Sequence, residues 1–222
     1  MDIAASLHET GLSQAECEYL VANCPLTAYK QGTTIADEEL EGTLFYVLKG
    51  LVKVDLLEQD GKPFSRFIAT KHFFPFGRCC QKKSFIKNQY YFMAWTDVVA
   101  LKINPHALRA LEAMNLRWKH VLFEDCFYQG TISEDMTLAV SQPAAPDRIW
   151  MTILALAHYF GDTRQGFVYL PRTFTRDMIA NIANSTLPTI SKTLRSHVCA
   201  QEALTRRGVI AVHQTVLKKK YG

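Results

Sequence analysis

Residues Thr173–Arg195 (TFTRDMIANIANSTLPTISKTLR) carry side chains whose types and spacing suit nucleic-acid recognition. Apolar residues recur at helical spacing in two short stretches, about 176–182 and about 186–197, and polar or basic residues lie between them. Thr175 precedes the first stretch as a candidate N-cap, and Asn184 lies in the intervening turn, where it tolerates a left-handed conformation. This pattern is typical of a helix-turn-helix, although a generic pair of packed helices is an alternative reading.

The second stretch is expected to bury Ile190 and Leu194 and to project its remaining face outward. Pro188 falls in the first helical turn, where backbone amides lack intrahelical partners, so it does not break the helix. The outward-facing residues are Leu187, Pro188, Thr189, Ser191, Lys192 and Arg195.

The charge distribution points the same way. Of the 222 residues, those after position 140 include 11 basic and four acidic ones, a net charge of +7. The first 140 residues carry −3, which completes the total of +4. Such an asymmetry indicates a nucleic-acid-facing C-terminal part, with a merely solvated basic face as the alternative. A composition of 48% hydrophobic and 21% charged residues excludes a disordered chain.

The first hundred residues predict a separate domain that precedes the nucleic-acid-facing part. A helical lead-in covers residues 1–28, with Ser13 and Glu16 at capping-box spacing. Short apolar runs bounded by turn residues then predict a small jelly-roll barrel, and Asp60-Gly61 suits a tight hairpin turn. The expected strands are 33–36, 44–48, 51–57, 64–69, 90–95 and 98–103.

A long helix is expected between the two parts. Asn104 is a candidate N-cap before Pro105, and residues 115–140 contain no proline. A helix of some 25 residues extends about 37 Å, more than one small barrel covers, so part of its apolar surface is expected to meet a second copy. Packing across its own barrel is the alternative. Ser141–Pro146 then predicts a hinge, followed by a helix over 148–160 and a strand over 166–170.

The order of these features resembles the cyclic-AMP receptor protein/FNR (CRP/FNR) family of bacterial transcription regulators. The likeness covers roughly residues 28–217 and includes Phe45–Val54, Asp147-Arg148-Ile149 and Phe174–Arg195. It implies an α+β fold with a cyclic-nucleotide-binding-like jelly-roll barrel (1–114), a dimerisation helix with a hinge (115–142) and a winged helix-turn-helix (143–222). It also implies a homodimer whose second helices enter the major groove of a near-palindromic operator in double-stranded DNA.

The resemblance carries over several contacts by position. Thr175, Arg176 and Thr186 match phosphate contacts, Lys192 matches an arginine that reads guanine, and His213 matches a backbone contact from the β-wing. Lys218–Lys220 add charge nearby. Leu187-Pro188 replaces the Arg-Glu of many members, which predicts apolar contacts such as those with thymine methyl groups. About seven extra residues within Ser196–Arg207 are expected either to lengthen the helix or to form a loop.

The barrel departs from members that bind cyclic AMP, which hold its phosphate and ribose with a Gly-Glu pair and an Arg-Ser or Arg-Thr pair. The corresponding stretches are Phe73–Arg78 and Asn88-Gln89, so both pairs are missing. We therefore expect an unknown small-molecule effector rather than cyclic AMP. This region is rich in aromatic residues. They could form the core of the barrel, or they could surround a ligand that is less polar than cyclic AMP. The candidate effector-binding residues are Phe76, Gly77, Arg78, Asn88, Gln89, Ile132 and Ser133.

Other cofactors find little support in the sequence. Cys17, Cys24 and Cys126 do not reproduce the four-cysteine set that holds the iron–sulfur cluster of FNR, and no histidine is singled out as a haem ligand. A thiol switch at Cys79-Cys80 stays open. No metal-ligand spacing, phosphate loop or nucleophile motif is present, so we expect neither a metal site nor catalytic residues.

The chain is expected to be cytoplasmic and to have no membrane partner, because it lacks a signal peptide and any apolar run of 18 residues. The resemblance adds RNA polymerase as a possible partner. A second hypothesis is a degenerate barrel that acts as a ligand-independent or protein-interaction module. The basic C-terminal part argues against that hypothesis.

Overall fold

The computed structural model describes residues 2–35, 42–57, 63–68, 72–74, 89–114 and 117–222. The chain divides into two compact units, Met1–Gln129 and Gly130–Gly222. The division falls within helix α6 (Arg117–Val140), whereas the sequence placed domain boundaries after residues 114 and 142. Within the described ranges, no helix combines the length and the apolar character needed to cross a membrane.

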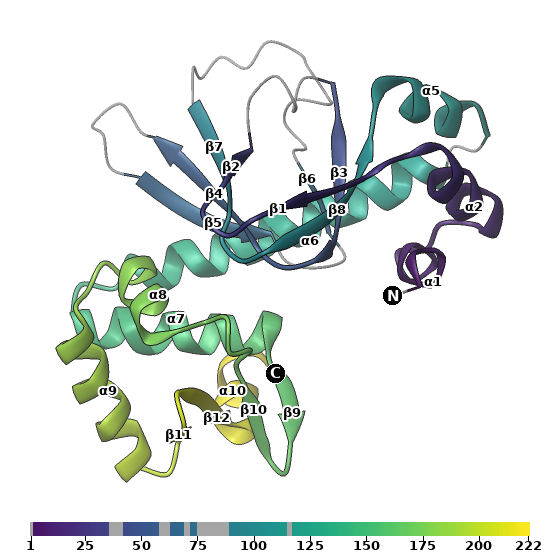
Figure 1. Cartoon of the computed structure of the whole chain (residues 1–222). Helices are drawn as coiled ribbons and strands as arrows, with labels where there is room; N and C mark the ends of the chain where they lie inside the picture. The colour runs from purple at the N-terminus through teal and green to yellow at the C-terminus, as the bar shows by residue number, and fades with distance from the viewer. Residues whose placement is uncertain (1, 36–41, 58–62, 69–71, 75–88, 115–116) are drawn as a thin grey trace. The chain divides into compact units, whose positions relative to one another are not determined.

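The first unit contains two antiparallel four-stranded sheets (Figure 1). One sheet has the order β1-β8-β3-β6 and consists of Leu26–Tyr29, Val98–Ile103, Leu44–Lys49 and Phe73–Phe74. The other has the order β2-β7-β4-β5 and consists of Thr34–Ile35, Gln89–Ala94, Val52–Leu57 and Pro63–Ile68. Each predicted strand is confirmed, and β4 pairs with β5 as expected for a hairpin. The turn at Asp60-Gly61 lies outside the described residues. The short strands β1 and β6 were not predicted.

Strand β3 shows how the core of this unit is divided. Leu44, Tyr46 and Leu48 belong to a cluster that includes residues of α1 (Ile3–His8), α2 (Gln14–Asn23), α5 (Pro105–Met114) and α6. Phe45 and Val47 belong to a second cluster with residues of both sheets. Side chains alternate across a strand. One face of the β1-β8-β3-β6 sheet is therefore covered by helices and the other by the second sheet.

Two predicted helix caps are confirmed. Ser13 and Glu16 form a capping box at the start of α2, in which the Ser13 amide donates to Glu16 Oε2 at 2.7 Å. Asn104 Oδ1 accepts from the Ala107 amide at 2.9 Å at the start of α5. These local signals set where the helices begin.

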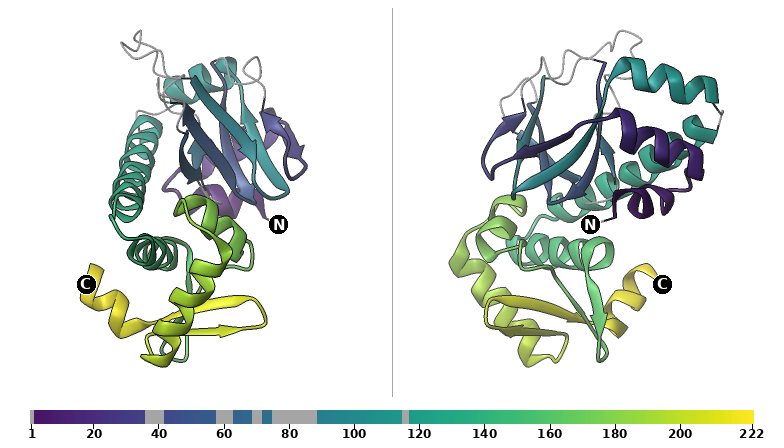
Figure 2. Two further views of the ribbon diagram at one scale, coloured as in Figure 1. Left: turned by 90° about the vertical axis from the view of Figure 1, so that its left-hand side faces the viewer. Right: turned by 45° about the vertical axis from the view of Figure 1, so that its right-hand side comes forward.

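The second unit combines a small sheet with five helical segments, the last part of α6 among them. Its further elements are α7 (Ala145–Phe160), β9 (Asp162–Arg164), β10 (Phe167–Tyr169), α8 (Arg176–Ile182), α9 (Leu187–Cys199), β11 (Ala203–Arg206), β12 (Val209–His213) and α10 (Gln214–Tyr221). The sheet has the order β11-β12-β10-β9. Helices α7, α8 and α9 pack on one another, and α7 also contacts β10 and β12 (Figure 2).

The hinge is shorter than predicted. Helix α6 ends at Val140 and α7 begins at Ala145, so four residues separate them rather than the expected Ser141–Pro146. Pro146 lies in the first turn of α7, where the missing amide proton of proline costs no hydrogen bond. The helix therefore starts three residues before the predicted Arg148.

The segment between α9 and the wing holds no long loop. Helix α9 extends to Cys199, only residues 200–202 lie between it and β11, and Gln201 has a φ of +62°. The residues that the sequence left as a longer helix or a loop therefore form the last helical turn, a short turn and a wing strand. Strand β9 was also missed, because its three residues are all exposed and carry no apolar alternation.

Candidate nucleic-acid interface

The helix-turn-helix forms where the sequence predicted it. Thr175 Oγ1 caps α8 by accepting from the Met178 amide at 3.2 Å. Asn184 takes a φ of +45° in the turn, and the Ser185 amide donates to the Ala180 carbonyl at 2.9 Å. The two helices thus meet through a turn whose geometry depends on an asparagine in the left-handed region.

Helix α9 has a buried face and an open face. Ile190 and Leu194 are fully buried, and the buried Thr193 hydroxyl donates to the Thr189 carbonyl at 2.9 Å. Leu187 is 46% exposed, although a large apolar side chain usually finds cover. The predicted contact residues divide between exposed Thr175, Thr186, Leu187, Pro188, Lys192 and Arg195 and half-buried Arg176, Thr189, Ser191 and His213.

The N-terminus of α9 is open to a ligand. Thr186 occupies the N-cap position, yet its side chain accepts no capping hydrogen bond. Its hydroxyl instead lies 2.9 Å from the hydroxyl of Thr189. Pro188 has no amide proton, so within the first turn the amides of Leu187 and Thr189 are left without a side-chain cap, and the helix dipole favours an anion there. Arg176 adds a buried Nε atom with no hydrogen-bond partner among the described residues.

Arg148 joins the interhelical segment to the helix-turn-helix. Its Nε atom donates to the Ala183 carbonyl at 3.1 Å and its Nη2 atom to the Asn184 carbonyl at 3.4 Å. Its Nη1 atom donates to the carbonyls of Gln142 and Pro143 at 3.1 and 2.9 Å. The guanidinium thus links the chain entering α7 to the turn between α8 and α9. In the sequence, Arg148 was noted only as part of the family resemblance. No local pattern predicts its hydrogen bond to the Ala183 carbonyl, which is 35 residues away.

The C-terminal end of α9 is held by a stacked pair. The rings of Trp150 in α7 and His197 in α9 lie 3.6 Å apart and are nearly parallel. His197 Nδ1 also lies 2.6 Å from Glu202 Oε2. Because these contacts tie α9 to α7 and to the start of the wing, they position the exposed face of α9.

The wing is the β11–β12 hairpin, and its tip carries a basic residue that the sequence analysis did not single out. In the β11–β12 hairpin Arg206 pairs with Val209, so Arg207 and Gly208 form the turn, with φ of +49° and +79°. His213 is the last residue of β12, at the opposite end of that strand from the turn, and its ring accepts from the Thr215 amide. Its proposed DNA contact stays a prediction. The Arg-Gly dipeptide between two short runs was the signal that could have located the tip.

Most of the predicted effector-binding residues lie outside the residues that the structure describes. Phe76, Gly77, Arg78 and Asn88 lie outside the described residues, as do Cys79 and Cys80. Gln89 opens strand β7 opposite Leu57. Ile132 is buried and Ser133 half-buried, both on α6 in the second unit. No described contact brings these residues together, and the effector assignment stays a prediction.

Of the aromatic residues near that region, Phe73, Phe74 and Phe92 are buried in the core, whereas Tyr91 is 45% exposed. Phe74 stacks between Phe45 and Phe92, with ring centroids 5.1 and 5.6 Å away. Cys17 and Cys24 are also buried, and burial raises the pKa of the Cys24 thiol to about 11, so this thiol is protonated at neutral pH. Among the described residues, no group of three or more His, Cys, Asp or Glu side chains could hold a metal ion.

Comparison with known proteins identifies the architecture. No family model matches the chain, and no curated protein matches it by sequence. A cyclic nucleotide-binding domain containing protein from Listeria monocytogenes superimposes with a TM-score of 0.73, at 15% identity over 90% of this chain and 96% of the other. FixK2 from Bradyrhizobium japonicum gives 0.65, at 16% identity over 88% and 96%.

A transcriptional regulator of the CRP/FNR family from Thermus thermophilus gives a TM-score of 0.57, at 18% identity over 88% of this chain and 97% of that one. At 88–90% of this chain, these matches extend into both units. The chain therefore has the fold of the CRP/FNR regulators, with a cyclic-nucleotide-binding-like barrel followed by a winged helix-turn-helix.

Proposed function

We propose that the protein is a sequence-specific DNA-binding transcription regulator and that α9 is its recognition helix. The observation that carries this proposal is the open face of α9, where Leu187, Pro188, Lys192 and Arg195 are exposed beside an N-terminus that no side chain caps. A helix with free amides at one end and basic side chains along one face suits the major groove.

The phosphate contacts follow from the same geometry. A phosphate at the N-terminus of α9 would accept from its first amides and from the Thr186 hydroxyl. The Arg176 guanidinium, whose Nε atom has no partner among the described residues, supplies a charged donor at the start of α8. Arg207 at the turn between β11 and β12 supplies another from the wing.

Base readout would combine one cation with apolar contacts. Lys192 can donate to the O6 and N7 acceptors of guanine, without the planar fork of an arginine. Leu187 and Pro188 offer no hydrogen bond to a base edge, so they favour contact with thymine methyl groups. The operator should therefore differ from one that is read by a charged pair at these two positions.

A homodimer formed along α6 is part of the proposal. Some apolar residues of α6, such as Trp118 and Met136, are buried within their own chain and are not available to a second copy. Three other apolar residues of α6 are strongly exposed instead: Phe123 at 69%, Phe127 at 72% and Leu138 at 60%. They are four and eleven residues apart, a spacing that places them on one helix face. Exposed apolar surface of this kind favours a second copy of the helix.

A small effector would act on the segment that Arg148 holds. The residues that bind cyclic AMP in the family are missing from the sequence, so the effector we propose is a different small molecule. Two arrangements of residues 141–144 would be in equilibrium, and the effector would bind the protein more tightly in one of them. The difference between its two binding free energies sets how far the effector can shift that equilibrium. Breaking or keeping the bonds from Arg148 to the carbonyls of Gln142 and Pro143 offers such a pair of arrangements.

An operator selected from random DNA, followed by binding measurements over a salt series, tests the function. Binding should weaken steeply with salt, since each phosphate contact releases a counterion. Lys192→Gln should reduce discrimination at one base position by about 1–3 kcal/mol. Lys30→Gln, a matched loss of charge on the exposed ion pair with Asp97, should not. A protein-interaction module would select no operator, and equal effects of the two variants would remove α9 from the proposal.

A further inference from the structure

One face of the sheet of the second unit is covered, and the other, called the uncovered face below, is covered only in part: Ala211 on it is buried, whereas Leu204 and Arg206 are exposed. Val168 and Val212 are buried and directly opposite each other, so they lie on the covered face. Tyr169 is opposite Ala211, which in turn is opposite Leu204, and Leu204 is 41% exposed. Because directly opposite residues point to the same side of a sheet, these three side chains form a row across the uncovered face.

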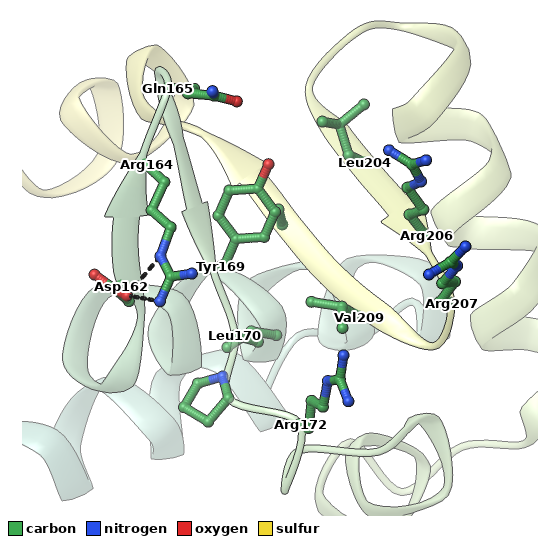
Figure 3. Close-up of a pocket in the computed structure, with 12 residues that line it drawn as sticks. Asp162, Arg164, Gln165, Tyr169, Leu170, Arg172, Leu204, Arg206, Arg207 and Val209 are labelled. Atoms are coloured by element: carbon green, nitrogen blue, oxygen red, sulfur yellow. Dashed lines mark hydrogen bonds and ion pairs between the residues drawn. The ribbon is translucent and has the colours of Figure 1, made fainter.

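A cavity of about 700 Å³ lies over this uncovered face (Figure 3). Its floor is aliphatic and aromatic, with Leu170, Val209 and Tyr169 among its residues. Four arginines line it: Arg164, Arg172, Arg206 and Arg207. Figure 3 shows Arg172, Arg206 and Arg207 gathered toward the wing turn, while Arg164 lies at the other side of the cavity.

The positive charge of the cavity is not balanced. The Arg164 guanidinium is neutralised by Asp162, whose Oδ2 atom accepts from Nε at 2.8 Å. Arg172, Arg206 and Arg207 are exposed and form no ion pair with any residue in the part of the chain that the structure describes. The cavity therefore presents three guanidinium groups to whatever enters it.

The turn residue Arg207 is not explained by local backbone preference. Both turn positions of the hairpin have positive φ, and asparagine, aspartate or glycine are the usual residues at the first of them. The equivalent turn between β9 and β10 places Gln165 and Gly166 in the same geometry. Residues of both tight hairpin turns, Gln165 and Arg207, thus line the cavity over the uncovered face, and Arg207 brings a positive charge to it.

We propose that this cavity binds a small organic polyanion of the nucleoside polyphosphate class. Guanidinium groups bind phosphate oxygens through paired, charge-assisted hydrogen bonds, which suits the three arginines near the wing turn. The ring of Tyr169 and the aliphatic floor suit a flat base, and the volume is in the range of small-molecule sites. A DNA backbone would engage the arginines but would leave the apolar floor unused. This inference does not depend on DNA binding.

Titration calorimetry on the full chain with ATP and GTP, at fixed ionic strength, tests the proposal. We expect saturable binding, and a loss of affinity of about tenfold or more in the Arg206→Gln/Arg207→Gln pair, because each lost bond joins two charged groups. Both residues are exposed, so the variant should unfold at the same urea concentration as the parent. Tyr169→Leu should weaken the nucleotide but leave inorganic triphosphate unaffected.

A matched pair on α9, Lys192→Gln/Arg195→Gln, removes the same charge outside the cavity and should change nucleotide affinity less than twofold. Three results would overturn the proposal. The first is no saturable nucleotide binding, including the case in which the cavity variants change only DNA affinity. The second is an equal loss of nucleotide affinity in both pairs, which would mean simple attraction to a basic surface. The third is equal affinity for nucleotide and inorganic triphosphate, which would leave the floor without a role.

Discussion

Strand β3 of the first unit and strand β11 of the second show two uses of an antiparallel sheet. In β3 five consecutive residues are buried, because helices cover one face and a second sheet covers the other. In β11 the buried Ala203 is followed by exposed Leu204, half-buried Thr205 and exposed Arg206. A sheet covered on both faces serves stability, whereas a sheet with one partly uncovered face leaves side chains exposed to solvent.

The same contrast appears in where charge is placed. Leu44–Leu48 contains no ionisable side chain other than Tyr46, and burial raises the pKa of the Tyr46 phenol to about 12, so it stays neutral. The uncovered face of the wing sheet instead carries arginines whose charge remains in contact with water. An unpaired charge at a covered position would lower the free energy of unfolding, because its desolvation is not offset by new hydrogen bonds.

The largest expected effect comes from deleting a ring on a covered face. Phe74→Ala removes a fully buried side chain that stacks on Phe45 and Phe92, so we expect the free energy of unfolding to fall by about 3–5 kcal/mol. Leu204→Ala on the uncovered face should change it by less than about 0.5 kcal/mol. Urea denaturation followed by tryptophan fluorescence, with Trp118 in the first unit and Trp150 in the second, and by far-ultraviolet dichroism measures both. Similar losses in the two variants would break the comparison.

Much of this contrast could be read from the sequence. The continuous apolar run at residues 44–48 predicted a strand, and a continuous run is typical of burial on both faces. The helix-turn-helix followed from Thr175 and Asn184, since capping and left-handed turns are local properties. Capping residues, turn residues and the spacing of apolar residues were therefore enough to predict these elements of the fold.

The uncovered face could not be predicted in the same way. The four arginines of the cavity are spread over positions 164–207, and the pairing of β9, β10, β11 and β12 brings the segments that carry them to one cavity. Register depends on tertiary contacts that no single segment encodes. The wing tip differs, because the Arg207-Gly208 dipeptide was a local signal for its turn that the sequence analysis did not use.

A smaller effect is expected where the second unit is itself covered. A Cβ atom on Gly161 would lie 2.3 Å from Val168 Cγ1 and 2.4 Å from the Ala157 carbonyl oxygen, so Gly161→Ala must displace α7 or β10. We expect a loss of about 1–3 kcal/mol, the usual cost of overpacking.

Gly130→Ala is the matched control for Gly161→Ala. Apart from the neighbouring residues and backbone of its own helix, no atom lies within 4 Å of the added methyl group, and alanine favours a helix over glycine by up to about 1 kcal/mol. Thermal unfolding of both variants compares them, and a tolerated Gly161→Ala would show that the covered face of the wing sheet is loosely packed.

The smallest and sharpest contrast lies between two threonines at equivalent helix positions. Thr175 caps α8 with its hydroxyl, so Thr175→Ala should cost about 1 kcal/mol of stability. Thr186 occupies the same position before α9 without capping it, so Thr186→Ala should cost less than about 0.5 kcal/mol and should instead weaken operator binding. Urea denaturation and DNA titration on both variants measure the two effects. If Thr186→Ala destabilised the fold as much as Thr175→Ala and left DNA affinity unchanged, the N-terminus of α9 would serve structure alone. The division between side chains that stabilise the fold and side chains that remain exposed for a partner would then not extend to α9.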